Sequence, residues 1–199
     1  MDAQFWDERY ASRDQLFSGR PNGVLVTEVS GLPPGQALDV GCGEGGDAIW
    51  VARRGWRVTA IDVSAVALRR AAKAGADVAE RVAWTRADLT VSSPPAGSFD
   101  LVSAQYFPLL REGGEGTLRS LLAAVAPGGT LLVAGHDVAD WPEPGEGGHD
   151  PRDFYLPHDI AGLLGSEWTV EVDETRPRVD PAPEGTRHSH DTVLRARRR

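Results

Sequence analysis

A glycine-rich turn flanked by carboxylates is the part of this chain best suited to chemistry. It reads Asp39-Val-Gly-Cys-Gly-Glu-Gly-Gly46, and a later apolar stretch ends at Asp62, 21 residues beyond Gly41. Glycines let a backbone turn tightly and approach a ligand closely. A carboxylate at the end of the following strand accepts hydrogen bonds from ribose hydroxyls. The pattern therefore indicates a site for a nucleotide-type cofactor.

The charges of this turn decide between two cofactors. Its glycines satisfy both the G-x-G-x-x-G of dinucleotide sites and G-x-G-x-G. A pyrophosphate needs backbone amides and positive charge, whereas this turn carries Asp39 and Glu44. A carboxylate at position 39 suits the ammonium of a methionine moiety, and Asp88, after a third apolar stretch, suits an adenine amino group. The carboxylates therefore favour S-adenosylmethionine (SAM) over NAD.

The same stretch resembles a known family. Its segments look like the successive motifs of class I SAM-dependent methyltransferases, in the right order, at residues 38–45, 60–62, 87–89, 98–102 and 126–132. This resemblance covers about residues 36–135. The N-terminal Phe5-Trp-Asp-Glu-Arg-Tyr10 and the segment 45–50 resemble the tellurite-resistance and thiopurine-type branch, which acts on small molecules. Members of that branch usually carry an Arg-Asn-like pair where this chain has Gly46-Asp47.

Alternating patterns predict an α/β, Rossmann-like, doubly wound and mostly parallel sheet with helices on both faces. Five strands are expected at 36–41, 57–61, 82–87, 99–104 and 130–134. Antiparallel strands at 168–172 and 191–196 bring the number to seven. Helices are expected at 4–15, 23–31, 45–54, 65–74, 117–125 and 156–164. We expect one domain, with a helical lid (1–35), a cofactor-binding core (36–135) and a substrate-side loop with the C-terminal strands (136–199).

The strand ends position the cofactor, because ligands of open α/β sheets lie beyond the carboxyl ends of the strands. SAM would run across this edge, with its methionine part at the glycine turn, its ribose at the second strand and its adenine at the third. The residues assigned to it are Asp39, Gly41, Cys42, Gly43, Asp62, Val63, Asp88, Leu89 and Gln105.

Two residues at the same edge are candidates for a catalytic role. His136 follows the fifth strand and has a pKa range that suits proton abstraction, although substrate contact or loop capping is the alternative. Tyr106 follows the fourth strand and would wall the acceptor pocket, unless it is a packing aromatic. Methyl transfer needs mainly positioning and desolvation, so a base is not obligatory. His188 and His190, expected on one face of a strand, lack a clear third ligand, so no metal site is predicted.

Two further segments have a functional and a structural interpretation. Trp6, Tyr10 and Phe17, with the turn-rich residues 19–22, would form a lid that excludes water and offers aromatic faces to the sulfonium. The alternative is an amphipathic helix packed on the sheet. The polar stretch 136–158 is long for a loop in a compact domain, which points to function or mobility.

The composition limits which classes of substrate and which cellular locations are expected. A net charge of -8 argues against a nucleic-acid substrate, and no apolar run approaches the ~18 residues of a membrane span. The single cysteine, Cys42, fits a reducing cytosol. We expect a cytoplasmic, bacterial enzyme, monomeric or homodimeric, that methylates a small molecule at an oxygen, nitrogen, sulfur or heavier chalcogen. A SAM-binding sensor without catalysis and an NAD(P)-dependent oxidoreductase stay as alternatives.

Overall fold

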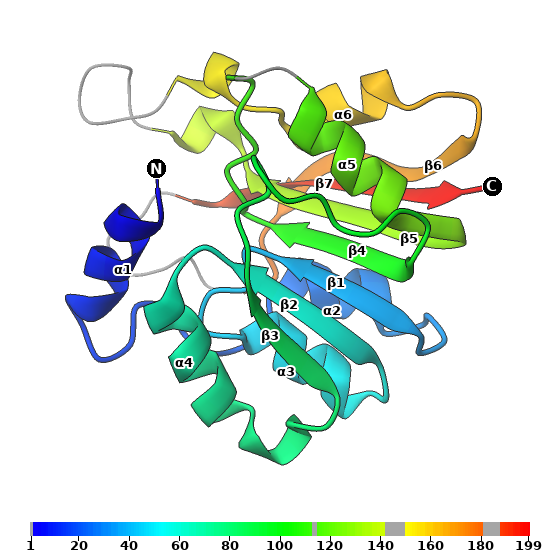
Figure 1. Ribbon diagram of the computed structural model, residues 1–199. Helices are drawn as coiled ribbons and strands as arrows, with labels where there is room; N and C mark the ends of the chain where they lie inside the picture. Colours follow the sequence, from blue (N-terminus) through cyan, green and yellow to red (C-terminus); the bar gives the residue numbers. More distant parts are fainter. Residues whose placement is uncertain (1, 113–114, 142–149, 181–187) are drawn as a thin grey trace.

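The computed structural model describes residues 2–112, 115–141, 150–180 and 188–199. Within them, seven strands form one twisted sheet (Figure 1). The strands are β1 (Gln36–Val40), β2 (Arg57–Asp62), β3 (Val82–Arg86), β4 (Phe99–Gln105), β5 (Val125–His136), β6 (Trp168–Pro177) and β7 (His190–Arg198).

The strand order of the sheet is β3-β2-β1-β4-β5-β7-β6. The neighbours from β3 to β5 pair in parallel, whereas β7 pairs antiparallel with both β5 and β6. The chain first adds strands on one side of β1 and then returns with β4 to its other side. In such sheets this switch point opens a ligand crevice at the carboxyl ends of the strands. The predicted fold class is confirmed.

Helices cover both faces of the sheet, as predicted (Figure 1). Leu25, Ile49 and Leu68, which belong to α2, α3 and α4, join one core cluster, whereas α5 and α6 contribute to the cluster on the opposite face. The helices are α1 (Ala3–Ala11), α2 (Gly23–Val29), α3 (Gly46–Arg53), α4 (Ala65–Ala74), α5 (Gly116–Ala124) and α6 (Pro157–Leu163). Short 3-10 turns lie at Ala76–Val78 (η1), Val138–Asp140 (η2) and Pro151–Asp153 (η3).

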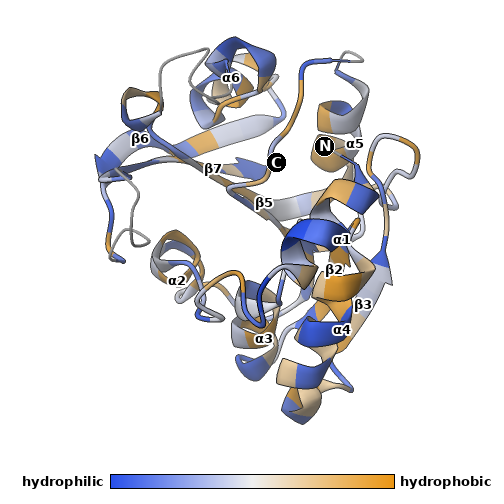
Figure 2. Ribbon diagram, turned by 90° about the vertical axis from the view of Figure 1, so that its left-hand side faces the viewer, coloured by the Kyte–Doolittle hydropathy of each residue, from blue (hydrophilic) through white to orange (hydrophobic). Residues whose placement is uncertain are grey.

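Helix α4 shows how local sequence places one side of the site. Ser64 caps its first turn by accepting a hydrogen bond from the backbone N–H of Ala67 at 3.1 Å. Ala67, Leu68 and Ala71 are buried, and hydrophobic and hydrophilic bands alternate along the helix in Figure 2. The predicted bounds and cap are both observed. The cap holds the short connection from β2, so that Asp62 lies at the edge of the sheet.

The predicted elements differ from the structure mainly at their ends. The N-terminal helix ends at Ala11 rather than at residue 15, and beyond it Glu44 binds the backbone N–H groups of Leu16 and Phe17. Strands β5 and β6 are longer than expected. Pairing with β7 extends β6 and the C-terminal end of β5 to His136, and β5 begins earlier where Val125 pairs with Phe99 of β4. These extensions depend on neighbours in space rather than on local periodicity.

The polar stretch after β5 is described only in part. Residues 142–149 lie outside the described residues, so the interpretation of that segment as a functional or mobile loop is untested there. On either side of it the chain forms η2 and η3, and Phe154 makes a β-bridge with Leu110.

No helix in the described ranges has the length and apolar character needed to cross a membrane.

Candidate active site

The glycine turn between β1 and α3 is enclosed by two aromatic side chains. Gly41 and Gly43 have positive φ angles of 68° and 52°, which glycine adopts without a steric penalty. A Cβ atom at Gly41 would lie 2.6 Å from Cδ2 of Phe107, and one at Gly43 would lie 2.8 Å from the hydroxyl of Tyr10. Both positions therefore require glycine for space as well as for conformation.

Asp62 lies at the carboxyl end of β2 with its carboxylate held on both sides. Its Oδ2 accepts a hydrogen bond from the backbone N–H of Gly43 at 2.9 Å, and its Oδ1 accepts one from Ser64 at 2.8 Å. Burial raises its pKa, while these backbone bonds act in the opposite direction. Each oxygen keeps a further acceptor position, so the group is fixed and able to receive hydroxyl donors.

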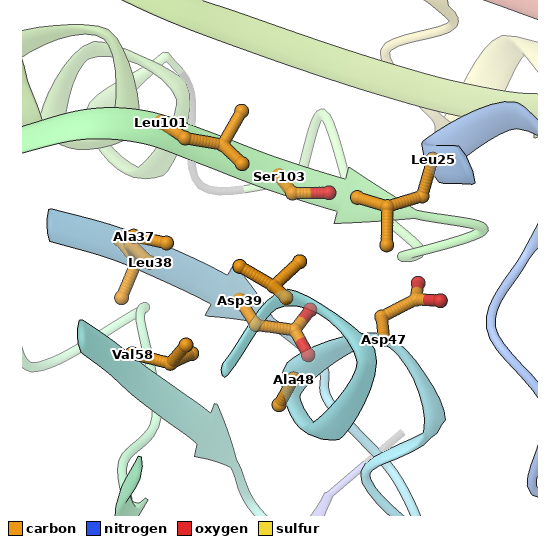
Figure 3. A pocket seen from close by; sticks show the side chains of 10 residues that line it. Leu25, Ala37, Leu38, Asp39, Asp47, Ala48, Val58, Leu101 and Ser103 are labelled. Atoms are coloured by element: carbon orange, nitrogen blue, oxygen red, sulfur yellow. The ribbon is translucent and has the colours of Figure 1, made fainter. Parts of the chain in front are cut away.

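Asp39 and Asp47 form a buried carboxyl pair beneath the glycine turn (Figure 3). Burial raises the pKa of both, to about 6 for Asp47, and for Asp39 the neighbouring Asp47 and Asp62 add to the effect. Asp47 accepts hydrogen bonds from the backbone and side chain of Asn22 at 2.7 and 2.8 Å. Oδ2 of Asp39 is buried without a partner among the described residues. The void beside them holds only about 10 Å³, too little for a ligand.

Asp88 lies in a different environment at the exposed end of β3. Its Oδ1 accepts hydrogen bonds from the backbone N–H and the hydroxyl of Thr90, at 2.9 and 2.7 Å. These bonds lower the pKa of Asp88, so it is ionised at neutral pH. The adjacent Leu89 is buried and provides an apolar surface next to the carboxylate.

One open cavity of about 950 Å³ connects these groups. Pockets for small molecules hold roughly 300–1,000 Å³, so this cavity has room for a cofactor and a second molecule. All eleven site residues expected from the sequence line it: Asp39, Gly41, Cys42, Gly43, Asp62, Val63, Asp88, Leu89, Gln105, Tyr106 and His136. Their individual roles stay predictions.

Tyr106 has a strained backbone conformation. It has a φ of 54°, the only positive value at a non-glycine position in the described ranges, and a bulky residue rarely adopts it. The turn after β4 brings the next residue, Phe107, against Gly41. Strain of this kind persists where the surroundings enforce it, commonly at functional sites.

The far wall of the cavity is a hydrogen-bonded cluster that the sequence did not reveal. The Tyr106 hydroxyl donates to Oδ1 of Asp191 at 2.9 Å, and Nη1 of Arg178 donates to the same oxygen at 2.6 Å. Nη1 also lies 3.1 Å from the Tyr106 hydroxyl and 3.4 Å from Nδ1 of His136. Since arginine only donates, a hydrogen bond between Nη1 and His136 requires Nδ1 to accept, with the ring proton on Nε2.

This cluster makes His136 and Tyr106 poor bases at neutral pH. Burial, with His188 and Arg178 nearby, lowers the pKa of His136 to about 3. Burial and the Asp191 carboxylate raise the pKa of Tyr106 well above its usual range. A neutral imidazole and a neutral phenol can orient an acceptor by hydrogen bonding, so the geometry favours the alternative of substrate contact for His136.

The histidines near the C-terminus are arranged differently from the expectation. His188 precedes β7 rather than sharing a strand face with His190, and its ring stacks on that of His136 at 3.7 Å between centroids. Within the described ranges no group of three potential metal ligands occurs. Cys42 is buried and burial raises its pKa, which makes a nucleophilic thiolate unfavourable.

Carboxylates attach the N-terminal segment to the core. Asp7 of α1 accepts hydrogen bonds from the hydroxyl of Ser64 at 2.6 Å and the backbone N–H of Val66 at 3.0 Å, and α1 lies beside α4 (Figures 1 and 2). Glu44 binds the backbone of Leu16 and Phe17 and pairs with Arg70 at 2.9 Å. Tyr10 is buried, so this segment both packs on the core and covers the glycine turn. Its action as a lid stays a prediction.

Comparison with known proteins agrees with a cofactor site at this position of the fold. Residues 37–129 match the methyltransferase domain family. The chain is 33% identical over 176 residues to a ubiquinone biosynthesis O-methyltransferase of Methylocella silvestris, covering 79% of this chain and 66% of that protein. It is 26% identical over 168 residues to a 2-heptyl-1-hydroxyquinolin-4(1H)-one methyltransferase of Mycobacteroides abscessus, covering 82% of this chain and 72% of the relative.

A solved structure shares the whole fold. The N-methyltransferase NodS from Bradyrhizobium japonicum, in complex with S-adenosylhomocysteine (SAH), superposes with a TM-score of 0.74 at 18% identity, covering 100% of this chain and 99% of that one. The finer assignment to the tellurite-resistance and thiopurine-type branch stays a prediction. The ordered motifs, the cavity at the switch point of the sheet and these relatives lead to one assignment. The chain belongs to the class I SAM-dependent methyltransferase family.

Proposed function

We propose that this protein binds SAM in the open cavity and transfers its methyl group to a small-molecule acceptor. The observation that carries the proposal is the continuity of the cavity, which joins Asp39, Asp62 and Asp88 to an aromatic-walled space beyond β4 and β5. The curated relatives named above methylate small molecules, by their names. The chain spans about two thirds of the length of the first of them.

The residues present fit SAM. Asp39, Asp47 and Asp62 form no ion pair with any described cation, and a cationic ammonium group would supply the missing partner. Oε1 of Gln105 is likewise buried without a described partner and can accept from the same group. We assign the ribose hydroxyls to Asp62 and the adenine amino group to Asp88, with Val63 and Leu89 against the ring. A pyrophosphate would meet carboxylates instead, which disfavours the NAD(P) alternative.

The chain contributes positioning to the reaction. When bound, SAM would supply a methyl group on a cationic sulfur. The acceptor lone pair would bond to the methyl carbon in line with the C–S bond, and the C–S electron pair would return to sulfur. The protein aligns the acceptor with a donor at His136 and with the Tyr106 hydroxyl, which donates to Asp191 and therefore accepts from a ligand. Tyr10 and Phe107 cover the site, which excludes water. Any proton on the attacking atom passes to solvent, since neither Tyr106 nor His136 is a suitable base.

Calorimetric titration with SAM and SAH tests the cofactor assignment. We expect micromolar binding that Asp62→Asn weakens at least tenfold, because the amide cannot accept from both backbone N–H groups and the ribose. The exposed Asp77→Asn serves as the control and leaves the affinity unchanged. NADH titration should show no binding; NADH binding without SAM binding would overturn the assignment.

An acceptor screen that detects SAH release separates an enzyme from a SAM-binding sensor. Turnover of at least one small molecule is expected, and SAM binding without any turnover would favour the sensor.

The net charge of -8 supports a small acceptor over a nucleic acid. A cytoplasmic location and a monomeric or homodimeric state remain predictions.

A further inference from the structure

A group of apolar and aromatic side chains lines the cavity. Trp6, Tyr10 and Phe17 come from the N-terminal segment, with ring centroids 6.1 Å apart for the first pair and 6.0 Å for the second. Phe107, Pro108, Leu109 and Leu110, which follow β4, also line it. Flat aromatic surfaces favour stacked or edge-on contact with another ring.

The charges that line the cavity are strongly unbalanced. Its described lining contains two arginines, Arg20 and Arg178, and eight carboxylates: Asp2, Asp39, Glu44, Asp47, Asp62, Asp88, Glu112 and Asp180. Even without the buried Asp39, Asp47 and Asp62, and without Glu44, which pairs with Arg70, four carboxylates face two arginines. Such a lining attracts a cationic cofactor and repels an anionic acceptor.

Arg178 does not offset this imbalance. Its side chain is 9% exposed, and its charge is balanced by Asp191 at 2.6 Å. Its Nη1 is also engaged by Tyr106 and His136, and its buried Nε has no partner within the described part of the chain. A guanidinium already paired with a carboxylate suits a neutral oxygen better than a second carboxylate.

The polar groups on the same wall are neutral. His136 is stacked between Tyr106 at 4.4 Å and His188 at 3.7 Å, measured between ring centroids. Only the edge of its ring is therefore open to a ligand. The N–H at that edge can donate to a hydroxyl or ring nitrogen, and the Tyr106 hydroxyl, which already donates to Asp191, can accept from a hydroxyl. Neither bond adds charge.

We propose that the methyl acceptor is an uncharged, planar aromatic molecule whose hydroxyl group or ring nitrogen binds at Tyr106 and His136, and that the acidic lining excludes carboxylate-bearing analogues. The proposal rests on the proposed function and specifies its substrate class. Specificity here comes from repulsion of the wrong ligand as well as from contact with the right one.

Two probes with the same ring system test this directly. 2-Naphthol and 6-hydroxy-2-naphthoate differ by one carboxylate, and each is titrated into protein saturated with SAH at low ionic strength. We expect 2-naphthol to bind at least tenfold more tightly. Glu112→Lys should reduce that ratio, because it replaces a negative charge of the lining with a positive one. Glu80→Lys, an exposed change outside the cavity, is the matched control and should leave the ratio unchanged.

The outcomes separate this inference from the proposed function. SAH is titrated first, and failure of SAH to bind would remove the proposed function and this inference together. If SAH binds, equal or tighter binding of the naphthoate overturns the acceptor class alone, and so does the absence of binding by either probe. A ratio that Glu80→Lys changes as much as Glu112→Lys would show that net charge, rather than the cavity lining, controls selection.

Discussion

At the scale of single residues, the site depends on carboxylates kept in an unfavourable environment. Asp39, Asp47 and Asp62 are buried together, and burial raises the pKa of each. Without a ligand, this arrangement lowers the stability of the folded protein, because the charged forms lose hydration. A cationic ligand relieves that cost, which couples cofactor binding to the ionisation of the site.

Asp47→Asn should flatten the dependence of stability on pH. The pKa of Asp47 is raised from 3.8 to about 6, so between these pH values the folded protein holds a proton that the unfolded chain has released. The free energy of unfolding therefore falls as pH rises from about 4 to 6, by up to about 3 kcal/mol. Urea denaturation of the ligand-free protein at pH 4 to 7 measures this. Asp14→Asn, an exposed change, is the control, and an unaltered slope in Asp47→Asn would contradict the assignment.

Gly41→Ala should damage both the turn and the cofactor site. The φ of 68° is strained for alanine, and its Cβ would collide with Phe107. We expect a loss of about 1–3 kcal/mol in stability, the usual cost of a strained backbone position. We also expect at least tenfold weaker SAH binding. Adding Phe107→Ala should relieve the collision but not the strain. Gly116→Ala, where a Cβ meets nothing within 4 Å, should be neutral by both thermal denaturation and calorimetry.

At the scale of elements, the N-terminal segment is attached to the core through polar contacts at several points. Asp7 binds the start of α4, Glu44 binds the backbone of residues 16 and 17, and Asn22 binds Asp47. Tyr10 then packs over the glycine turn. Because the attachments are hydrogen bonds rather than a large apolar interface, this segment should open at lower free energy than the sheet.

Glu44→Gln should loosen this segment without unfolding the core. The glutamate accepts from two backbone N–H groups and pairs with Arg70, and hydrogen bonds to a charged group contribute about 1.5–3 kcal/mol. Hydrogen exchange followed by mass spectrometry should show roughly tenfold faster exchange in residues 12–22. Glu115→Gln removes the exposed pair with Arg119 and should have little effect. Unchanged exchange in Glu44→Gln would mean that packing alone holds the segment.

At the scale of the whole molecule, the last strand completes both the sheet and the site. β7 lies between β5 and β6, and Val193, Leu194 and Ala196 are fully buried. The same strand carries Asp191, which anchors Arg178 and Tyr106. The cavity therefore depends on strand pairing between the cofactor-binding core and the C-terminal part of the chain.

Leu194→Ala should destabilise the protein while leaving the cofactor site intact. Removing a fully buried leucine side chain costs about 2–5 kcal/mol, and Leu194 does not line the cavity. Urea denaturation measures the loss, and SAH titration under native conditions should give an unchanged affinity. Val170→Ala, at a 44% exposed position on β6, should cost well under half as much. Equal effects would indicate that the C-terminal strands contribute little to the core.

Much of the cofactor site could be predicted because its signals are local. The spacing of Asp39, Gly41 and Asp62 along two strand ends is visible in the sequence, and the pairing of β1 with β2 brings these residues together. Arg178 and Asp191 carried no such signal. They lie 13 residues apart without a recognisable motif, and their ion pair exists only because β6 and β7 form an antiparallel pair.

The sequence by itself determined the strand periods, the glycine turn, the cap of α4 and the acidic character of the cofactor site. These features depend on backbone conformation and on residues close together in the chain. Only the tertiary structure decided that Tyr10 and Phe107 enclose the turn, that Glu44 holds the N-terminal segment, and that burial, with His188 and Arg178 nearby, keeps His136 neutral. Those contacts join distant segments, so they follow from the strand order and the burial it creates rather than from any local pattern.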